Sequence, residues 1–157
     1  MKKIFLLAVA MLCAFVNYAQ YWQLPNITIG QNPGALNTDV EEPIAGVTGW
    51  TSIQAASATP VWSSTQTLPF AFNFNGAPVT QYKISTTGVL TFDVATALAA
   101  PSATNLSLPN AAIPNKSVCV WGITCSGTND NIVTKTFGTA PNRQYWVQYS
   151  SDRKSVV

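Results

Sequence analysis

Hydrophobic and polar residues alternate most regularly between residues 68 and 92. Over residues 70–74, three phenylalanines alternate with smaller residues, which is the period-2 pattern of a half-buried strand. Asn75-Gly76 follows as a tight-turn signal. Two more strand-like segments, 82–85 and 89–92, come next, so the block predicts a β-meander of three strands.

Shorter strand-like segments lie on both sides of this block, and none has a helical period. They cover residues 24–29, 50–54, 117–124 and 132–137, and a further segment starts at Arg143. Turn residues separate the strands, and Gly88 of Thr86-Thr87-Gly88 is expected to supply a positive φ. Residues 94–100 lack a helix cap, which favours a loop or one helical turn. Short, regularly spaced strands predict an all-β fold, an antiparallel β-sandwich of the jelly-roll or Ig-like kind.

Residues 1–19 have the organisation of a secretory signal peptide. Lys2 and Lys3 are cationic, residues 4–16 are apolar, and Ala19 is a small residue suited to cleavage. The apolar run is shorter than the roughly 20 residues of a membrane span, so we expect no span after cleavage. An uncleaved anchor is the alternative. The mature chain is predicted to be secreted, to the extracellular space or the outer cell surface.

The last six residues, 152–157, match the translation of a common short-read sequencing adapter. The segment before them, 144–149, has the pattern of a strand interrupted mid-run. We therefore expect a fragment: a β-sandwich module over residues 20–151, incomplete at its C-terminus, with a processing scar at 152–157. A genuine polar C-terminus is the alternative.

The positive formal charge of the chain comes from its two ends. Between residues 20 and 151 there are four basic and five acidic side chains, a net charge of −1. Binding to a phosphate backbone requires clustered Lys and Arg. No such cluster is present, so nucleic acid is not an expected partner.

Two cysteines, Cys119 and Cys125, remain after signal cleavage, and an exported protein permits a disulfide. If the segment between them were one straight strand, the two would be about 20 Å apart. A bridge needs Cα atoms within about 7 Å. Only a reversal at Gly122 would join them, so free or differently paired thiols are favoured.

The candidate metal ligands are acids in loops. Asp39 and Glu41 lie in a Pro-bounded segment, and Asp130 stands between two asparagines. Carboxylate and amide oxygens suit Ca²⁺, although neither spacing matches a known calcium loop. A solvated acidic turn is the favoured explanation of the first group. The Asp130 segment could bind calcium or a sugar hydroxyl, and Asx-turn hydrogen bonding explains it at least as well. No cofactor is expected, and Ca²⁺ is the one alternative.

No catalytic site is predicted in this chain. It contains no histidine, which excludes Ser-His-Asp and Cys-His catalysis. Glycoside hydrolysis requires a pair of carboxylates, and Asp93 and Asp130 are too isolated in sequence to form one with any support. The five tryptophans either stack on sugars or peptides or fill the core, as most aromatic residues of a sandwich do.

Four segments together resemble the N-terminal β-sandwich module of large secreted Bacteroidota proteins, many of which carry a type IX secretion sorting domain. These segments are residues 32–39, 62–76, 82–92 and 129–133. The resemblance implies export, surface display and delivery by the secretion machinery through a downstream domain, and it supplies no catalytic residues.

The expected function is therefore that of a non-catalytic, cell-surface module for adhesion, ligand binding or structural presentation. Polysaccharide and surface proteins are the expected partners. The alternative is an accessory module of a secreted hydrolase, a protease or glycosidase, whose catalytic domain lies downstream.

Overall fold

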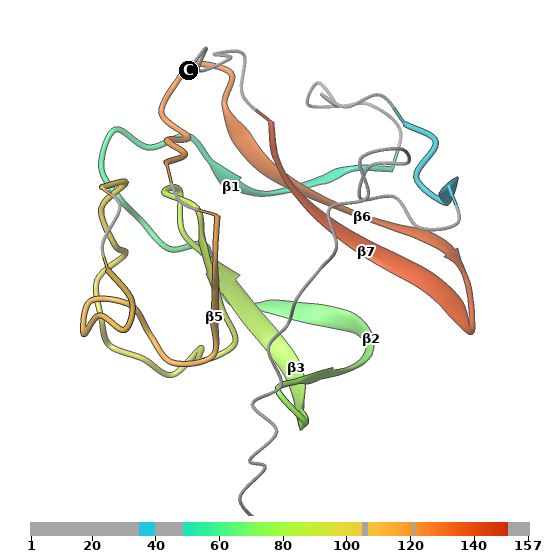
Figure 1. The fold of residues 1–157 in the computed structure, drawn as a ribbon. Helices are drawn as coiled ribbons and strands as arrows, with labels where there is room; N and C mark the ends of the chain where they lie inside the picture. Colours follow the sequence, from blue (N-terminus) through green and yellow to red (C-terminus); the bar gives the residue numbers. More distant parts are fainter. Residues whose placement is uncertain (1–34, 40–48, 105–106, 121, 151–157) are drawn as a thin grey trace, which may run out of the picture. The chain divides into compact units, whose positions relative to one another are not determined.

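The computed structural model describes residues 35–39, 49–104, 107–120 and 122–150, all within the unit Asn32–Val157 (Figure 1). Its strands are β1 (Thr51–Ala55), β2 (Gln66–Phe74), β3 (Ala77–Ile84), β4 (Val89–Thr91), β5 (Ser117–Cys119), β6 (Asn131–Thr139) and β7 (Asn142–Ser150). The signal peptide over 1–19, the strand predicted at 24–29 and the tail over 152–157 lie outside the described residues.

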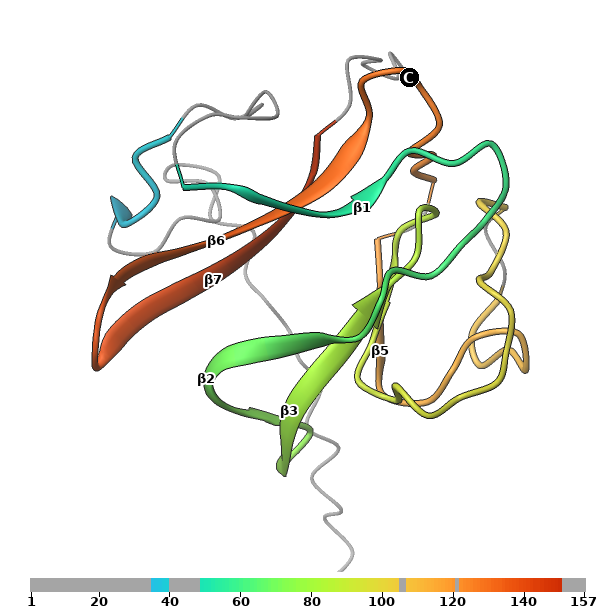
Figure 2. The ribbon, with the colours of Figure 1, turned by 180° about the vertical axis from the view of Figure 1, so that it is seen from behind.

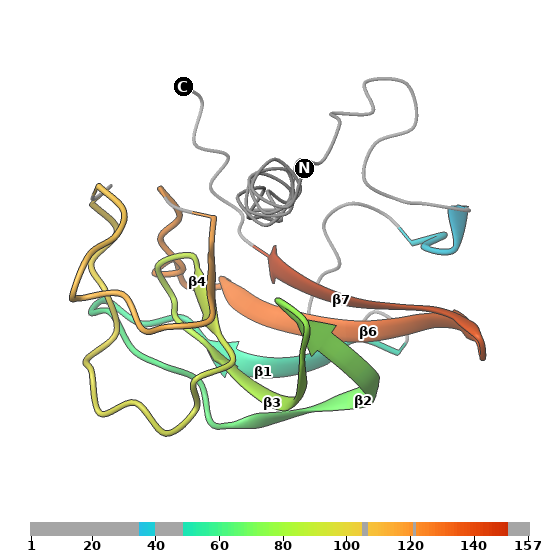
Figure 3. The ribbon, with the colours of Figure 1, turned by 60° about the horizontal axis from the view of Figure 1, so that its bottom comes forward.

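The strands form two antiparallel sheets, one in the order β1-β6-β7 and the other in the order β2-β3-β4-β5. Figure 2 shows β1 running alongside β6, and Figure 3 shows the β2–β3 hairpin next to the three-stranded sheet. No α-helix occurs in the part of the chain that the structure describes. The predicted all-β sandwich is confirmed.

The predicted meander is β2, β3 and β4, which are neighbours in one sheet. Asn75 and Gly76 join β2 to β3 with positive φ values of 51° and 76°, the backbone that a two-residue hairpin turn requires. The β2–β3 register breaks between Thr67 and Phe72, because Pro69 within that interval has no N–H to donate. The alternation over 70–74 is therefore not one continuous ladder.

This break separates the phenylalanines of β2. Phe72 and Phe74 pack on Phe92, with ring centroids 5.8 and 4.8 Å away. Phe70 instead lies beneath the guanidinium group of Arg143, 4.9 Å from its ring centroid. The aromatic pattern predicted a strand correctly, while the strand irregularity sends its rings to two different neighbours.

The strand predicted over 117–124 is shorter than expected, because β5 ends at Cys119. Gly122 has a φ of 85°, and the chain then folds back so that the Cys125 N–H donates to the Thr86 carbonyl at 2.9 Å. The predictions near 50–54, 132–137 and after Arg143 are confirmed as β1, β6 and β7. Residues 94–100 form a loop, one of the two predicted possibilities.

The core lies between the sheets. Tyr82 and Ile84 of β3 meet Ile132 of β6, and each is at most 2% exposed. Burying a side chain of this size contributes about 1.5–3 kcal/mol. Tyrosine hydroxyls also form hydrogen bonds across the core. The Tyr82 and Tyr145 hydroxyls are 2.8 Å apart, and the Tyr149 hydroxyl donates to the Ser85 carbonyl at 2.7 Å. Burial raises the pKa of Tyr149, so its proton stays in place for this bond.

The turn between β3 and β4 connects several distant segments. The Ser85 hydroxyl oxygen accepts the Val89 N–H at 3.0 Å, which closes the turn. Gly88 has a φ of 90°, as predicted, and a Cβ there would collide with the carbonyl oxygen of Val120. Other groups of residues 85–88 bond to Val61, Pro101, Val120 and Cys125. We call residues 85–89 the anchor turn.

Candidate functional site

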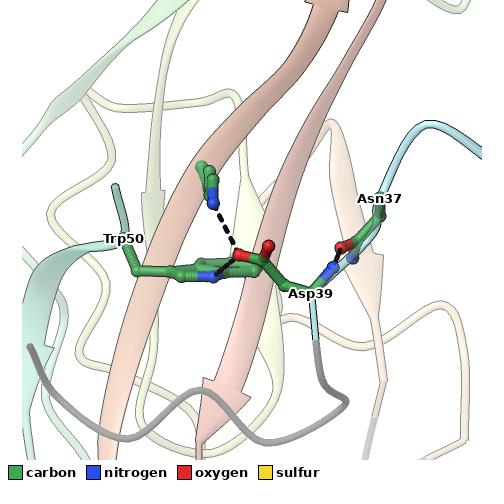
Figure 4. A network of polar contacts seen from close by, with 4 residues as sticks. Asn37, Asp39 and Trp50 are labelled. Atoms are coloured by element: carbon green, nitrogen blue, oxygen red, sulfur yellow. Dashed lines mark hydrogen bonds and ion pairs between the residues drawn. The ribbon is translucent and has the colours of Figure 1, made fainter. Parts of the chain in front are cut away.

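Asp39, a predicted calcium ligand, is part of an ion pair. Its Oδ2 atom accepts from Lys135 Nζ at 2.5 Å and from Trp50 Nε1 at 2.6 Å (Figure 4). Its own N–H donates to Asn37 Oδ1 at 3.0 Å. The bond from Lys135 holds the pKa of Asp39 below its ordinary value. The carboxylate thus fastens residues 35–39 to β6, while Glu41 lies outside the described residues.

Aromatic rings surround this ion pair. Lys135 Nζ lies 4.8 Å from the Phe137 ring centroid and 5.9 Å from that of Trp50. Phe137 meets Trp50 and Trp146 edge-on, at interplanar angles of 68° and 78°. Edge-to-face rings pack against one another, so they do not form the flat platform on which a sugar ring stacks.

Asp130 closes its own loop. Its side chain is buried, and Oδ2 accepts from the backbone N–H groups of Ser126 at 3.0 Å and Gly127 at 2.7 Å. The Asp130 N–H returns a bond to the Gly127 carbonyl at 3.2 Å. Both donors precede Asp130, so this is not the predicted Asx turn, in which the side chain accepts the N–H two residues on. The carboxylate nevertheless bonds to the backbone of its own loop.

The two thiols are free, as the sequence favoured. Cys119 lies opposite Val89 in the sheet and is half-buried, whereas Cys125 follows a reversal of the chain and belongs to the core cluster. Burial raises the pKa of the Cys119 thiol, and burial together with the charge of Asp130 raises that of Cys125 to about 11. Neither is poised as a nucleophile at neutral pH.

Asp93 is in a different position, in the long loop between β4 and β5. It lines a cavity of about 480 Å³, which we call the loop cavity. The other lining residues come from the same loop and are Thr96, Leu98, Pro109, Asn110, Ala111, Ile113, Pro114 and Asn115. The Asp93 carboxylate has no hydrogen-bond or ion-pair partner among the described residues. Asp93 is therefore the one described acid whose oxygens stay available.

The walls of the loop cavity are fixed by side chains of the sheet. On one wall, Lys83 Nζ donates to the Thr96 carbonyl and Trp62 Nε1 donates to the Leu98 carbonyl, both at 3.0 Å. On the other wall, Thr91 Oγ1 donates to the Asn115 carbonyl, also at 3.0 Å. Lys83 lies over the Trp62 ring, 5.2 Å from its centroid. The loop is long, but its backbone is held at several points.

Sequence reasoning missed this cavity because its residues are spread along an irregular segment. Asp93 and Asn110 have no motif spacing, and nothing in their neighbours shows that they line one space. The local signal was limited to a run of prolines and asparagines with little periodicity.

Within the described ranges, no group of three or more His, Cys, Asp or Glu residues is placed to hold a metal ion. The same residues contain no helix long and apolar enough to cross a membrane. Trp22 and Trp121, two of the predicted aromatic candidates, lie outside these ranges, and Trp50, Trp62 and Trp146 are half-buried.

Comparison with known proteins gives one match. The family model described as NIDO related matches residues 38–155, which is most of the chain. No curated protein and no solved structure matches it. The match agrees with the predicted extracellular module, and the relation to Bacteroidota secretion remains a prediction. The chain belongs to the NIDO-related family, an extracellular, non-enzymatic type of module.

Proposed function

We propose that this chain is a recognition module of a longer secreted protein, and that it serves adhesion, ligand binding or structural presentation at the cell surface. The family supports the extracellular, non-catalytic part of this proposal. The finer part, binding of a surface ligand, rests on which acidic side chains are already bonded within the structure and which are not.

The observation that carries the proposal is the division among the three described acids. Asp39 is bonded to Lys135 and Trp50, and Asp130 is bonded to the backbone of its own turn. Asp93 alone among the three lines the loop cavity, and its carboxylate has no partner among the described residues. One carboxylate among amide and hydroxyl groups suits hydrogen bonding to a ligand, whereas glycoside hydrolysis requires two.

The expected partners are an extracellular polysaccharide or a surface protein, with delivery through a downstream secretion domain. A module attached to a secreted hydrolase would bind in the same way, and its ligand would then be the polymer that the rest of the protein cleaves. Calcium has no supporting cluster in the described part of the chain.

A binding and turnover assay tests the proposal. The labelled chain is titrated against isolated cell-surface polysaccharides and surface proteins, and in parallel it is incubated with fluorogenic glycosides, esters and peptides. We expect saturable binding to at least one surface component and no turnover above buffer. Turnover that disappears in Asp93→Asn would contradict a non-catalytic role, and absence of binding to every component would contradict recognition.

Export is tested separately on intact cells that express the full chain with a tag. We expect an N-terminus at Gln20 by mass spectrometry and digestion of the tag by externally added protease. Retention of residues 1–19 together with protection from the protease would contradict the extracellular assignment.

A further inference from the structure

We infer that the loop cavity binds a neutral saccharide through Asp93 and Asn110. The inference rests on the recognition function proposed above and assigns it a site and a ligand class. It depends on the hydrogen-bonding character, the shape and the rigidity of the cavity.

The polar groups of the cavity include both acceptors and donors. The Asp93 carboxylate supplies acceptor oxygens. Asn110 Oδ1 already accepts the Ala112 N–H at 2.9 Å, so the amide offers its two N–H groups to a ligand. Thr96 Oγ1 accepts the Leu98 N–H at 3.3 Å and keeps a hydroxyl proton to donate. Sugar hydroxyls donate and accept at once, and this mixture complements them.

Apolar surface accompanies these groups. Leu98 is 41% exposed, and Ile113 and two prolines complete the lining. The C–H faces of a sugar ring are apolar and match such a surface. The volume of about 480 Å³ falls in the range of about 300–1,000 Å³ that is usual for small-molecule sites.

The cavity is also held in shape before a ligand arrives. Lys83 and Trp62 bond to one wall, and Thr91 bonds to the other, so residues on strands or next to them position the loop backbone. Lys83 is only 8% exposed, which limits its movement. A preformed site avoids the ordering cost that a mobile loop incurs on binding.

The charge distribution selects against ionic ligands. An anion would be repelled by Asp93, since Lys83 is directed to the Thr96 carbonyl and to the Trp62 ring. An amine would pair with Asp93 but would leave the Asn110 amide donors unmatched, which costs affinity. A neutral polyhydroxylated ligand satisfies both groups.

Calorimetric titration of the full chain tests this inference. The probes are neutral gluco-, xylo- and manno-oligosaccharides, an acidic oligogalacturonate and a lysine-rich peptide, each with and without EDTA. The variants are Asp93→Asn and Asn110→Asp, which keep side-chain shape. Asn110→Asp also retains the acceptor for Ala112. The matched control is Asn73→Asp, which adds the same charge on exposed β2 outside the cavity lining.

We expect at least one neutral oligosaccharide to bind, and we expect both cavity variants to weaken it by at least tenfold, the size of a lost charge-assisted bond. Asn73→Asp should bind as the unaltered chain does, with or without EDTA. Preference for the acidic sugar or the peptide, dependence on a divalent cation, or equal binding by all variants would overturn the saccharide site. Binding of no probe would also overturn it, while the wider recognition function would stand if surface components still bound in the earlier assay.

Discussion

Two loops with similar composition have opposite properties in this protein. Residues 126–130 and the loop between β4 and β5 each contain one aspartate among Asn, Ser or Thr and turn-forming residues. Asp130 is 4% exposed and bonded to its own backbone, whereas Asp93 is half-buried, lines a cavity and has no partner for its carboxylate among the described residues. An aspartate in a polar loop is therefore no sign of a ligand site until the backbone donors around it are accounted for.

Loop length explains the difference. A tight turn brings successive backbone N–H groups toward one centre, and the carboxylate of Asp130 satisfies them. The loop between β4 and β5 is too long to close on itself, so Lys83, Trp62 and Thr91 support it from outside. Asp130 therefore stabilises its own loop. The loop that contains Asp93 is held by other residues, and the Asp93 carboxylate stays unbonded.

The largest expected effect lies in the anchor turn, which is closed by its own hydrogen bonds, as the Asp130 loop is. Gly88→Ala introduces a Cβ against the carbonyl of Val120 in a positive-φ backbone. We expect a loss of about 3 kcal/mol in the free energy of unfolding, measured by urea denaturation.

Gly76→Ala is the control for Gly88→Ala, because Gly76 also has a positive φ but open space around its Cβ position. It should cost about 1 kcal/mol. Equal losses for the two variants would show that close packing at the anchor turn contributes nothing.

A smaller effect is expected where β7 bonds to the anchor turn. Tyr149→Phe removes the donor to the Ser85 carbonyl and keeps the ring in the core. We expect a loss of about 1–2 kcal/mol in the free energy of unfolding. An unchanged urea midpoint would mean that water replaces the hydroxyl without cost and that the contact between sheets depends on the rings alone.

The smallest effect concerns the half-buried ion pair of Asp39. Its pKa is lowered in the folded state, so the unfolded chain binds more protons near the ordinary pKa of 3.8. The stabilisation is present above this pH and is lost as the pH falls below it. The difference in urea midpoint between the unaltered chain and Asp39→Asn should therefore be positive at pH 7 and shrink toward pH 3. A difference that stays constant or grows on acidification would contradict the pairing.

The sequence predicted what depends on neighbouring residues. The alternation over 68–92 and the Asn75-Gly76 turn indicated the meander, because strand period and turn backbone are local properties. Local pattern did not reveal the end of β5 at Cys119, which depends on the chain folding back to Thr86.

The site residues show the same limit. The partners Asp39 and Lys135 are 96 positions apart, and only the fold brings them together. The alternating pattern predicts that Lys83 lies on the polar face of a strand. It is instead buried, and its ammonium group donates to the Thr96 carbonyl. Asp130 was a candidate ligand in the sequence and Asp93 was not, yet Asp130 is bonded to its own loop and Asp93 has no partner for its carboxylate among the described residues. These bonds depend on the fold and cannot be read from residue spacing.

One paired measurement tests most directly whether Asp130 is structural and Asp93 is not. The free energies of unfolding of Asp130→Ala and Asp93→Ala are compared with that of the unaltered chain by urea denaturation. We predict a loss of about 2–3 kcal/mol for Asp130→Ala, which removes two hydrogen bonds from backbone N–H groups to a charged acceptor. For Asp93→Ala we predict a change within about 0.5 kcal/mol, as for a surface position without structural bonds. Similar losses for the two variants would contradict the account, because Asp93 would then belong to the framework and not to an open site.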